Sequence, residues 1–518
     1  MGWNRPSSFS PPSSSKSRFT RSGGRQPRGF LTGRASNIIR TGRPPMLDTE
    51  TLDILMLDLD AREELLRDMV SERLASSPAP RIGDAVVATY FFALRTMPLR
   101  EAAEGVSYHA TSGIRTPPPG SLLEECTATT AGVDAFDLQQ RAGLAHIAFP
   151  LKMLRHPDGH VTSTDILHTI ASAAVFDLYE NQDARLVNVE IPDDVLRTFP
   201  GPAYGSLGVR RLTGFAPDQP AFGTILKPTA GITPEEVEGL VTEAARCPLF
   251  LLVKEDEDLY PDLDYSPAAQ RTRRAVDAIE RAREERQGLG LIFAPHITGA
   301  PHEILQMVEQ VLTAGATGVM FSETFGGGTV RMVREATKDR TQPPAIYGHN
   351  AGIGTRTRTI WREVIDLFAR LDGIDFRQTA PINPATPFLR PYGREWEASE
   401  RTLTRPLPTI KPTMIVRAGG LDQGNILLNL ADVEQRGVTE DVLFLAGSAI
   451  NSVKDARGLP SPALGAQAMM EALEVYRSGA LRDVPGKDQV RELADLARRR
   501  GFHALREALR QRYPGAVA

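Results

Sequence analysis

A short acidic segment that follows an apolar run has the residue types that bind a divalent metal ion. Residues 249–253 are apolar, and Lys254 is then followed by four acidic residues at 255–258. If the apolar run is a buried strand, Lys254 and Asp256 point to the same face, and Glu257 follows where the strand passes into its loop. Two carboxylates suit a hard ion such as Mg²⁺, which takes oxygen ligands. The segment therefore predicts a metal site, and a solvated charge run is the alternative interpretation.

The lysine in this segment has two possible roles. An ammonium group donates hydrogen bonds and has no lone pair to offer a metal. Lys254 is therefore either a salt-bridge partner of the neighbouring carboxylates or a lysine that CO2 has converted into a carbamate. A carbamate would supply a third anionic oxygen beside Asp256 and Glu257.

Other apolar runs also end in reactive side chains or in glycine. These ends are Lys227-Pro228, His349-Asn350, Arg377-Gln378, Gly419-Gly420 and Gly447-Ser448. Glycine turns at two neighbouring strand ends are typical of phosphate sites, because backbone N–H groups can face an anion there. The bland alternatives are a structural histidine and ordinary loop glycines.

Eight apolar runs alternate with helical patterns after about residue 218. The runs are 222–227, 249–254, 291–295, 318–322, 345–349, 373–377, 413–418 and 442–447. The helical patterns are 233–246, 268–285, 301–314, 360–371, 432–438 and 462–477. Eight such units over roughly 240 residues are typical of a (β/α)8 TIM barrel, in which chemistry belongs at the carboxyl ends of the strands. A doubly wound open sheet is the alternative.

The region before the barrel predicts a smaller α+β domain of ferredoxin-like type. Helical patterns cover 46–76, 99–104 and 163–175, and strand candidates cover 84–94, 143–150 and 186–191. Strands interleaved irregularly with helices indicate this α+β class. We therefore predict four parts: a tail at 1–45, an N-terminal α+β domain at 46–215, a catalytic barrel at 216–485, and a helical tail at 486–518 with one basic amphipathic helix at 488–512.

The composition argues against several classes of protein. Of 518 residues, 41% are hydrophobic and 24% charged, which is typical of soluble globular proteins, and the net charge of −4 argues against a nucleic-acid partner. Apolar runs fall short of the ~20 residues of a membrane helix, so no membrane partner is expected. Cys126 and Cys247 are far apart in the sequence, which fits a reducing cytoplasm.

Residues 1–45 differ from the rest of the chain. They are rich in Ser, Pro and Gly, with nine basic residues and no acidic residue. Such a segment buries too little apolar surface to fold alone, so we predict a disordered basic tail. A transit peptide, or a start codon assigned too early with Met46 as the true start, are the alternatives.

Over about residues 81–480 the sequence resembles the large chain of ribulose-bisphosphate carboxylase (Rubisco) and its Rubisco-like relatives. The motifs that carry the resemblance are Gly223–Pro228 with Gly231 after it, Lys254–Glu257, His349, Gly419-Gly420 and the turn at Gly447. The resemblance implies a homodimer or an assembly of dimers, in which the N-terminal domain of one chain closes the barrel mouth of the other.

The resemblance also implies a role for each matching residue. Lys254, as its CO2 carbamate, would bind Mg²⁺ with Asp256 and Glu257. Lys227 would be the base or proton shuttle that acts on an enediolate, and His349 would carry protons or contact the substrate near the metal. The substrate phosphate would be held by Arg377, Gly419, Gly420, Gly447 and Ser448.

Departures from the carboxylases bear on the reaction. Carboxylases carry a lysine in the loop after strand six, whereas residues 378–387 contain three prolines and no lysine. Asn350 replaces an arginine that binds the second phosphate, and Arg377 replaces a phosphate-binding histidine. In the N-terminal domain an asparagine is replaced near Ala174, and the Thr-Trp phosphate contact is missing from residues 108–112. These losses argue against CO2 fixation onto ribulose bisphosphate.

We therefore predict a Mg²⁺-dependent lyase or isomerase that forms or protonates an enediolate on a phosphorylated keto sugar or oxo sugar acid. The specific prediction is a decarboxylase of the 3-oxo-isoapionate 4-phosphate type in acid-sugar catabolism, because both Lys227 and His349 are retained. A methionine-salvage enolase or isomerase, a non-catalytic Rubisco-like scaffold and a true carboxylase are the alternatives.

Overall fold

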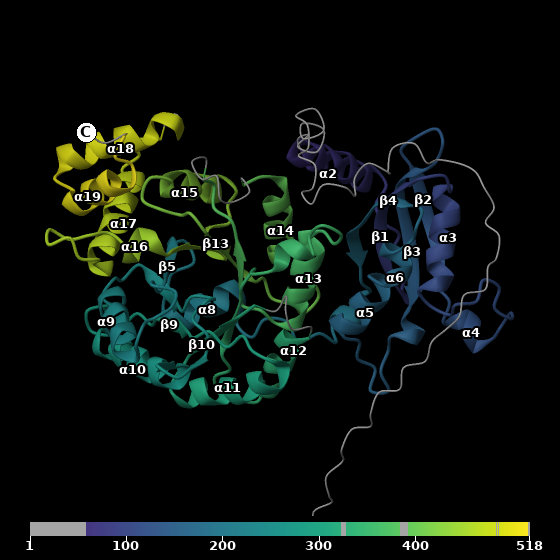
Figure 1. The fold of residues 1–518 in the computed structure, drawn as a ribbon, viewed down its shortest axis with the longest axis horizontal. Helices are drawn as coiled ribbons and strands as arrows, with labels where there is room; N and C mark the ends of the chain where they lie inside the picture. Colours follow the sequence, from purple (N-terminus) through teal and green to yellow (C-terminus); the bar gives the residue numbers. More distant parts are fainter. Residues whose placement is uncertain (1–58, 323–327, 384–391, 483, 485, 516–518) are drawn as a thin grey trace, which may run out of the picture. The chain divides into compact units, whose positions relative to one another are not determined.

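The computed structural model describes residues 59–322, 328–383, 392–482, 484 and 486–515. The predicted tail at 1–45, the start of the predicted helix at 46–76 and residues 384–387 of the loop after strand six lie outside the described residues. Along the described chain, an antiparallel sheet with its helices is followed by a barrel and then by C-terminal helices (Figure 1).

The barrel has eight parallel strands. They are β5 (Ala221–Ile225), β6 (Phe250–Lys254), β9 (Ile292–Ala294), β10 (Gly318–Phe321), β11 (Ala345–Gly348), β12 (Phe376–Thr379), β13 (Met414–Ala418) and β14 (Val442–Ala446). Hydrogen bonds join them in the order β10-β11-β12-β13-β14-β5-β6-β9. A parallel bridge between His296 and Met320 links the two ends of this order. The predicted barrel is therefore confirmed, and the closure excludes the open sheet.

Helices surround the barrel strands (Figure 1). They are α9 (Pro234–Ala245), α10 (Ala268–Arg281), α11 (Pro301–Thr313), α12 (Thr329–Thr337), α13 (Arg362–Asp372), α14 (Arg394–Thr404), α15 (Ile426–Gln435), α16 (Ser448–Asn451) and α17 (Pro462–Arg477). α9 begins where the sequence predicts, because Thr233 and Glu236 form a capping box around Pro234. α15 begins before the predicted 432, because Leu427 and the residues after it pack into the outer core.

The N-terminal part is built on an antiparallel sheet with the order β2-β3-β1-β4, which confirms the predicted α+β class. Its elements are α2 (Leu59–Ser76), β1 (Ala85–Leu94), α3 (Leu99–His109), α4 (Leu122–Glu125), β2 (Thr129–Ala135), β3 (Ala142–Pro150), α5 (Ser163–Ile170), α6 (Ala173–Phe176), β4 (Asn181–Glu190), α7 (Asp193–Leu196) and α8 (Gly205–Thr213). β2 was not predicted, because this edge strand is exposed or half-buried and has no apolar pattern. The boundaries of the four predicted parts stay predictions.

Shorter elements and two helices complete the described chain. The short elements are the 3₁₀ helices η1 (Leu151–Met153), η3 (Ile353–Thr355) and η4 (Thr439–Asp441) and the hairpin strands β7 (Asp262–Leu263) and β8 (Ser266–Pro267). The predicted single helix at 488–512 is wrong: α18 (Gly486–Arg500) and α19 (His503–Arg512) are separated at Gly501, whose φ of 72° no helix interior adopts. Among the described helices, none has both the length and the apolar character needed to cross a membrane.

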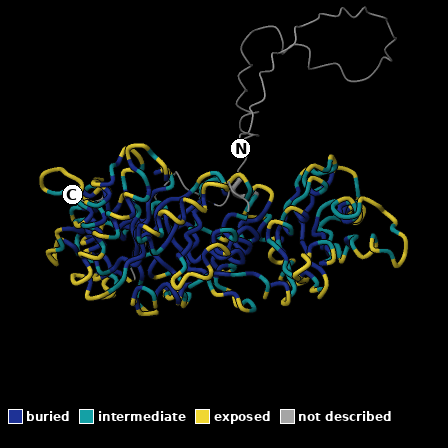
Figure 2. Tube along the Cα trace, turned by 90° about the horizontal axis from the view of Figure 1, so that it is seen from below, coloured by how far each residue is buried: buried dark blue, intermediate teal, exposed yellow. Residues whose placement is uncertain are grey.

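Side chains of the barrel strands alternate between the barrel interior and the helix layer. Leu252 of β6 packs in the interior cluster with Ile292 of β9, whereas Val253 packs in the outer cluster with the helices. Lys254 pairs in register with Ala294, a member of the interior cluster, and so continues the inward face to the end of the strand. Figure 2 shows buried residues concentrated inside the fold and exposed residues along its periphery.

Candidate active site

The lysine at the end of β6 is buried among polar partners. Lys254 has no exposed surface, and its Nζ donates to the carbonyl oxygen of Glu255 at 2.9 Å. Nζ lies 3.6 Å from Oε2 of Glu257 and 5.4 Å from the ring centre of Tyr347 on β11. Burial lowers the pKa of Lys254, and the carboxylates of Glu257 and Asp256 oppose this only in part. The lowered pKa favours the neutral amine, which is the form that reacts with CO2.

A second lysine reaches the same carboxylates from β5. Nζ of Lys227 lies 2.5 Å from Oδ2 of Asp256, which is 2% exposed, whereas Lys227 itself is 31% exposed. The Lys227 Cε atom also packs against the turn after β14, at 3.5 Å from the position that a Cβ on Gly447 would take. The structure therefore brings Lys227, Asp256 and Gly447 together from three strands.

The histidine after β11 is buried and held in one tautomer. Nδ1 of His349 accepts a hydrogen bond from the backbone N–H of Ala351 at 3.1 Å, so the proton of the neutral ring is on Nε2. Nε2 lies 3.3 Å from Oε2 of Glu257. Burial lowers the pKa of His349 well below 6.5, and Lys254 lowers it further. His349 is therefore a neutral N–H donor beside the predicted metal ligand.

Two glycine turns lie at the ends of β13 and β14. Gly419 and Gly420 have φ values of 92° and 78°, a conformation that a residue with a Cβ rarely adopts. The carbonyl oxygen of Gly420 accepts from Nδ2 of Asn425 at 2.8 Å. Ser448, directly after Gly447, is exposed. The sequence prediction that these turns occupy neighbouring strand ends agrees with the geometry, and phosphate binding there stays a prediction.

Arg377 is not brought into this group. Its side chain is fully buried, and Nε donates to Oδ1 of Asp366 on α13 at 2.6 Å. The predicted strand at 373–377 ended at Arg377, but β12 runs from Phe376 to Thr379, with Phe376 in the barrel interior. Arg377 therefore lies inside the strand and faces the helix layer, which argues against its predicted role in phosphate binding.

Sequence reasoning missed a supporting arrangement beneath β6. Glu255 points away from the interior and pairs with Arg271 of α10, both fully buried, at 2.7 Å. The backbone N–H of His296 donates to the same carboxylate at 2.9 Å, and Nδ1 of its ring is 3.0 Å from the Leu259 carbonyl oxygen. His296 directly follows the predicted run 291–295, so the rule that polar residues follow barrel strands could have identified it.

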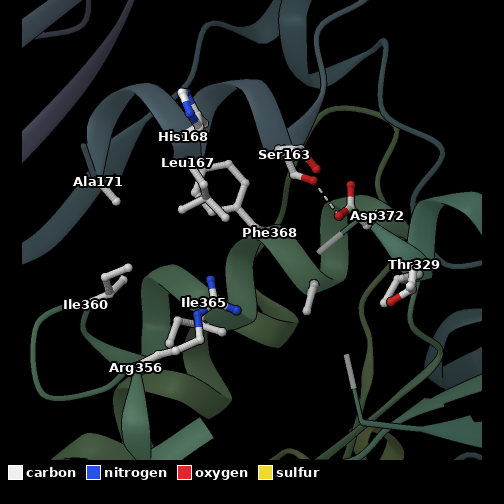
Figure 3. Close-up of a pocket in the computed structure, with 14 residues that line it drawn as sticks. Ser163, Leu167, His168, Ala171, Thr329, Arg356, Ile360, Ile365, Phe368 and Asp372 are labelled. Atoms are coloured by element: carbon white, nitrogen blue, oxygen red, sulfur yellow. Dashed lines mark hydrogen bonds between the residues drawn. The ribbon is translucent and has the colours of Figure 1, made fainter. Parts of the chain in front are cut away.

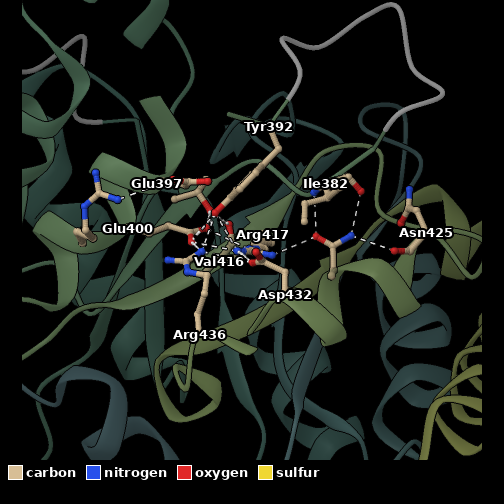
Figure 4. Close-up of polar contacts among 12 residues, drawn as sticks. Ile382, Tyr392, Glu397, Glu400, Val416, Arg417, Asn425, Asp432 and Arg436 are labelled. Atoms are coloured by element: carbon tan, nitrogen blue, oxygen red, sulfur yellow. Dashed lines mark hydrogen bonds and ion pairs between the residues drawn. The ribbon is translucent and has the colours of Figure 1, made fainter. Parts of the chain in front are cut away.

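The strand before the Gly419 turn is fixed from the helix side. Arg417 donates to both carboxylate oxygens of Glu400 on α14, each at 3.0 Å, and both side chains are fully buried. Figure 4 shows Tyr392, Asp432 and Arg436 gathered around the same ion pair. The guanidinium of Arg417 is therefore occupied in the helix layer, and its role is to hold β13.

A cavity of about 280 Å³ lies elsewhere, between α5 and α13 (Figure 3). Ser163 donates to Asp372 at its edge at 2.5 Å, and Leu167, Ile365 and Phe368 form apolar walls. The residues that line this cavity include none of the predicted site residues, so it is separate from the candidate active site.

The donor set was compared with the requirements of Mg²⁺. In the part of the chain that the structure describes, no three His, Cys, Asp or Glu side chains are grouped so that they could hold a metal ion. Asp256 and Glu257 provide carboxylate oxygens at the end of β6, and the buried Lys254 amine lies between them and the barrel interior. With a carbamate on Lys254, this set fits an oxygen-ligated ion.

Comparisons with known proteins point to one family. Residues 210–386 match the family described as ribulose bisphosphate carboxylase large chain, catalytic domain. The chain is 27% identical over 364 residues to 3-oxo-isoapionate-4-phosphate decarboxylase of Rhizobium etli, covering 68% of this chain and 80% of that protein. It is 33% identical over 191 residues to 3-oxo-isoapionate-4-phosphate transcarboxylase/hydrolase of Xanthobacter autotrophicus, covering 37% of this chain and 44% of that protein. Octameric Rubisco from Pyrococcus horikoshii has the same fold, with a TM-score of 0.69 and 22% identity over 83% of this chain and 94% of that one.

Proposed function

This chain belongs to the ribulose bisphosphate carboxylase large-chain family, and we propose that it is a Rubisco-like, Mg²⁺-dependent enzyme of that family. The proposed reaction forms or protonates an enediolate on a phosphorylated keto sugar or oxo sugar acid. The specific proposal is decarboxylation of a substrate of the 3-oxo-isoapionate 4-phosphate type, in a cytoplasmic pathway of acid-sugar breakdown.

The observation that carries the proposal is the convergence of two lysines and two carboxylates with a neutral histidine. Lys227 pairs with Asp256, while Lys254 and His349 both lie beside Glu257. Relatives that are named as acting on 3-oxo-isoapionate 4-phosphate give the substrate class, including the decarboxylase matched over four-fifths of its length.

Asp256, Glu257 and a carbamate on Lys254 would hold the Mg²⁺ ion. The buried position and lowered pKa of Lys254 support its reaction with CO2. When bound, Mg²⁺ polarises the substrate ketone and stabilises negative charge on its oxygen. The glycine turns at Gly419-Gly420 and Gly447-Ser448 would bind the phosphate through their backbone N–H groups.

The side chains of this site suit the proton transfer that decarboxylation requires. The bond between the carboxylate carbon and the adjacent carbon breaks, CO2 leaves, and the electron pair moves to the ketone oxygen to give the enediolate. Lys227, as an ammonium group, would then donate a proton from Nζ to the carbon that lost CO2. His349 would donate a hydrogen bond from Nε2 to a substrate oxygen, because its Nδ1 is already occupied by Ala351.

Several features argue against fixation of CO2 onto ribulose bisphosphate. Residues 378–387 contain no lysine, and the next lysine, Lys411, donates to the carbonyl oxygen of Ala203. Asn350 stands where the carboxylases have an arginine for a second phosphate, and Arg377 is paired with Asp366. One phosphate site supports a monophosphate substrate. We also propose a homodimer or an assembly of dimers, as the octameric relative supports.

The proposal is tested by incubating the protein with 3-oxo-isoapionate 4-phosphate, Mg²⁺ and bicarbonate and measuring CO2 release. We expect release that Asp256→Asn abolishes. Asp258→Asn is the matched control, because Asp258 is exposed and lies two residues away on the same segment. No CO2 release from the wild-type protein would refute the decarboxylase. Enolisation of a methionine-salvage substrate would then favour an enolase or isomerase, and inactivity with all of them a non-catalytic scaffold.

A further inference from the structure

Two residues that follow α17 and α18 in sequence contact the loop after β13. Nε of Arg512, the last residue of α19, lies 2.5 Å from Oδ2 of Asp422. The hydroxyl of Tyr513 lies 2.8 Å from each oxygen of the same carboxylate. Asp422 is 2% exposed and Arg512 is 37% exposed. The carboxylate is therefore enclosed by a cation and a phenol that lie about 90 residues later in the chain.

Asp422 in turn organises the turn that contains Gly419 and Gly420. Its Oδ1 accepts hydrogen bonds from the backbone N–H groups of Gly424 at 2.7 Å and Asn425 at 3.2 Å. Asn425 accepts from the backbone N–H of Asp422 at 3.0 Å and donates from Nδ2 to the carbonyl oxygen of Gly420 at 2.8 Å. A chain of hydrogen bonds therefore runs from α19 to the glycine turn.

The same residues also contact the loop backbone and the neighbouring turn. A Cβ on Gly424 would lie 2.6 Å from a ring carbon of Tyr513, so the ring packs directly on the loop backbone. Nη1 of Arg512 lies 3.5 Å from Oγ of Ser448, in the turn after β14. Both turns that are predicted to bind phosphate are thus linked to the end of α19.

We propose that Arg512 and Tyr513 are positioning residues for the phosphate-binding turns, an inference that rests on the phosphate site of the proposed function. Arg512 has two effects. It keeps Asp422 in the geometry that orders the Gly419-Gly420 turn, and it neutralises a carboxylate two residues from Gly420 that would otherwise repel the phosphate. Tyr513 contributes to the first effect alone.

The test measures binding of inorganic phosphate to the full chain by isothermal titration calorimetry at low ionic strength. Arg512→Gln is expected to raise the phosphate Kd roughly tenfold, because it removes a charge-assisted hydrogen bond and exposes the phosphate to an uncompensated carboxylate. Arg512→Lys keeps the charge and should lose less. Tyr513→Phe keeps the charge pair and should also weaken binding less than Arg512→Gln, with no change in its salt dependence.

Three comparisons separate this inference from a general loss of structure. Arg510→Gln is the matched control, because Arg510 is on the same helix and pairs with Glu507 alone among the contacts described for it. Asp422→Asn in the Arg512→Gln background removes the repelling charge and should recover part of the affinity. The difference between wild type and Arg512→Gln should also shrink at high salt, which screens the Asp422 charge. A loss of packing would show neither the recovery nor the salt effect.

Several results would overturn the inference. These are an unchanged Kd in Arg512→Gln, an equal loss in Arg510→Gln, or no recovery with Asp422→Asn. If Arg512→Gln does not fold, an unchanged Kd in both Tyr513→Phe and Arg512→Lys would overturn it as well. Absence of phosphate binding by the wild-type protein would refute both the phosphate site and this inference. Phosphate binding that depends on Arg512, in a protein that releases no CO2, would support the inference while refuting the proposed reaction.

Discussion

Removing the guanidinium of Arg271 is expected to destabilise the strand end that carries the site. Arg271 and Glu255 are both fully buried, with Nε and Nη2 at 2.7 and 3.0 Å from the two carboxylate oxygens. At 2.7 Å and an effective dielectric constant of about 20, unit charges attract by on the order of 6 kcal/mol. Desolvation offsets part of this attraction. Arg271→Met leaves Glu255 buried and unpaired by any cation, so we expect it to lower the free energy of unfolding by about 3–5 kcal/mol.

The assay is urea unfolding, in which the midpoint reports the change in stability when the m value is constant. Adding Glu255→Gln to Arg271→Met removes the uncompensated charge but keeps an acceptor for the backbone N–H of His296. The double variant is therefore expected to be more stable than Arg271→Met alone. Hydrogen exchange of the peptide that contains Lys254 would show whether the loss is local to the site.

A matched control separates this buried pair from ordinary surface pairs. Arg283 pairs with Glu280 at 3.2 Å just after α10, and both side chains are more than 60% exposed. Arg283→Met is expected to cost less than about 1 kcal/mol, because solvent screens exposed pairs. The reasoning would be refuted if Arg271→Met lost no more stability than Arg283→Met, or if Glu255→Gln failed to recover any of the loss.

Three further predictions concern the site itself. Lys227→Met is expected to slow exchange of the substrate α-proton with solvent deuterium by about 100-fold or more, measured by proton NMR; unchanged exchange would place the proton carrier elsewhere. With labelled CO2 and Mg²⁺, ¹³C NMR is expected to show a carbamate signal that Lys254→Ala removes, and a signal that survives in the variant would exclude Lys254 as its source. Because burial lowers the pKa of His349 well below 6.5, the unfolded chain takes up a proton near pH 6.5 that the folded protein does not. The stability associated with His349 is therefore fully present above that pH and decreases as the pH falls toward the lowered pKa; ¹⁵N NMR should show neutral Nε2–H at pH 6.5, and His349→Gln should reduce this pH dependence of stability.

Much of the fold could be predicted because each element has a local pattern. β6 is an apolar run that ends at Lys254, and α9 begins at a capping box that the residues around Pro234 specify. β2 could not be predicted, because an edge strand gains little from apolar residues. The single helix predicted at 488–512 ignored Gly501, whose left-handed conformation ends α18.

The site could be predicted in part for a similar reason. Lys254 and Asp256 share a face because side chains alternate along β6, and Lys227 follows β5 at the same end of the barrel. Arg377 failed this reasoning, because a shift in the bounds of β12 changed the face on which its side chain lies. Neither the neutral tautomer of His349 nor its lowered pKa could be foreseen, because both depend on the surrounding backbone and burial.

By itself the sequence determined the alternation of eight strands with helices, the residue types at the strand ends and the family resemblance, because these depend on periodicity and on neighbours along the chain. The tertiary structure decided which ends meet, that Arg377 and Arg417 serve the helix layer, and that Arg512 and Tyr513 reach Asp422. These outcomes depend on closure of the barrel and on the direction of each side chain after burial. Contacts between residues far apart in sequence are selected by the packing of the whole chain, and no local pattern encodes them.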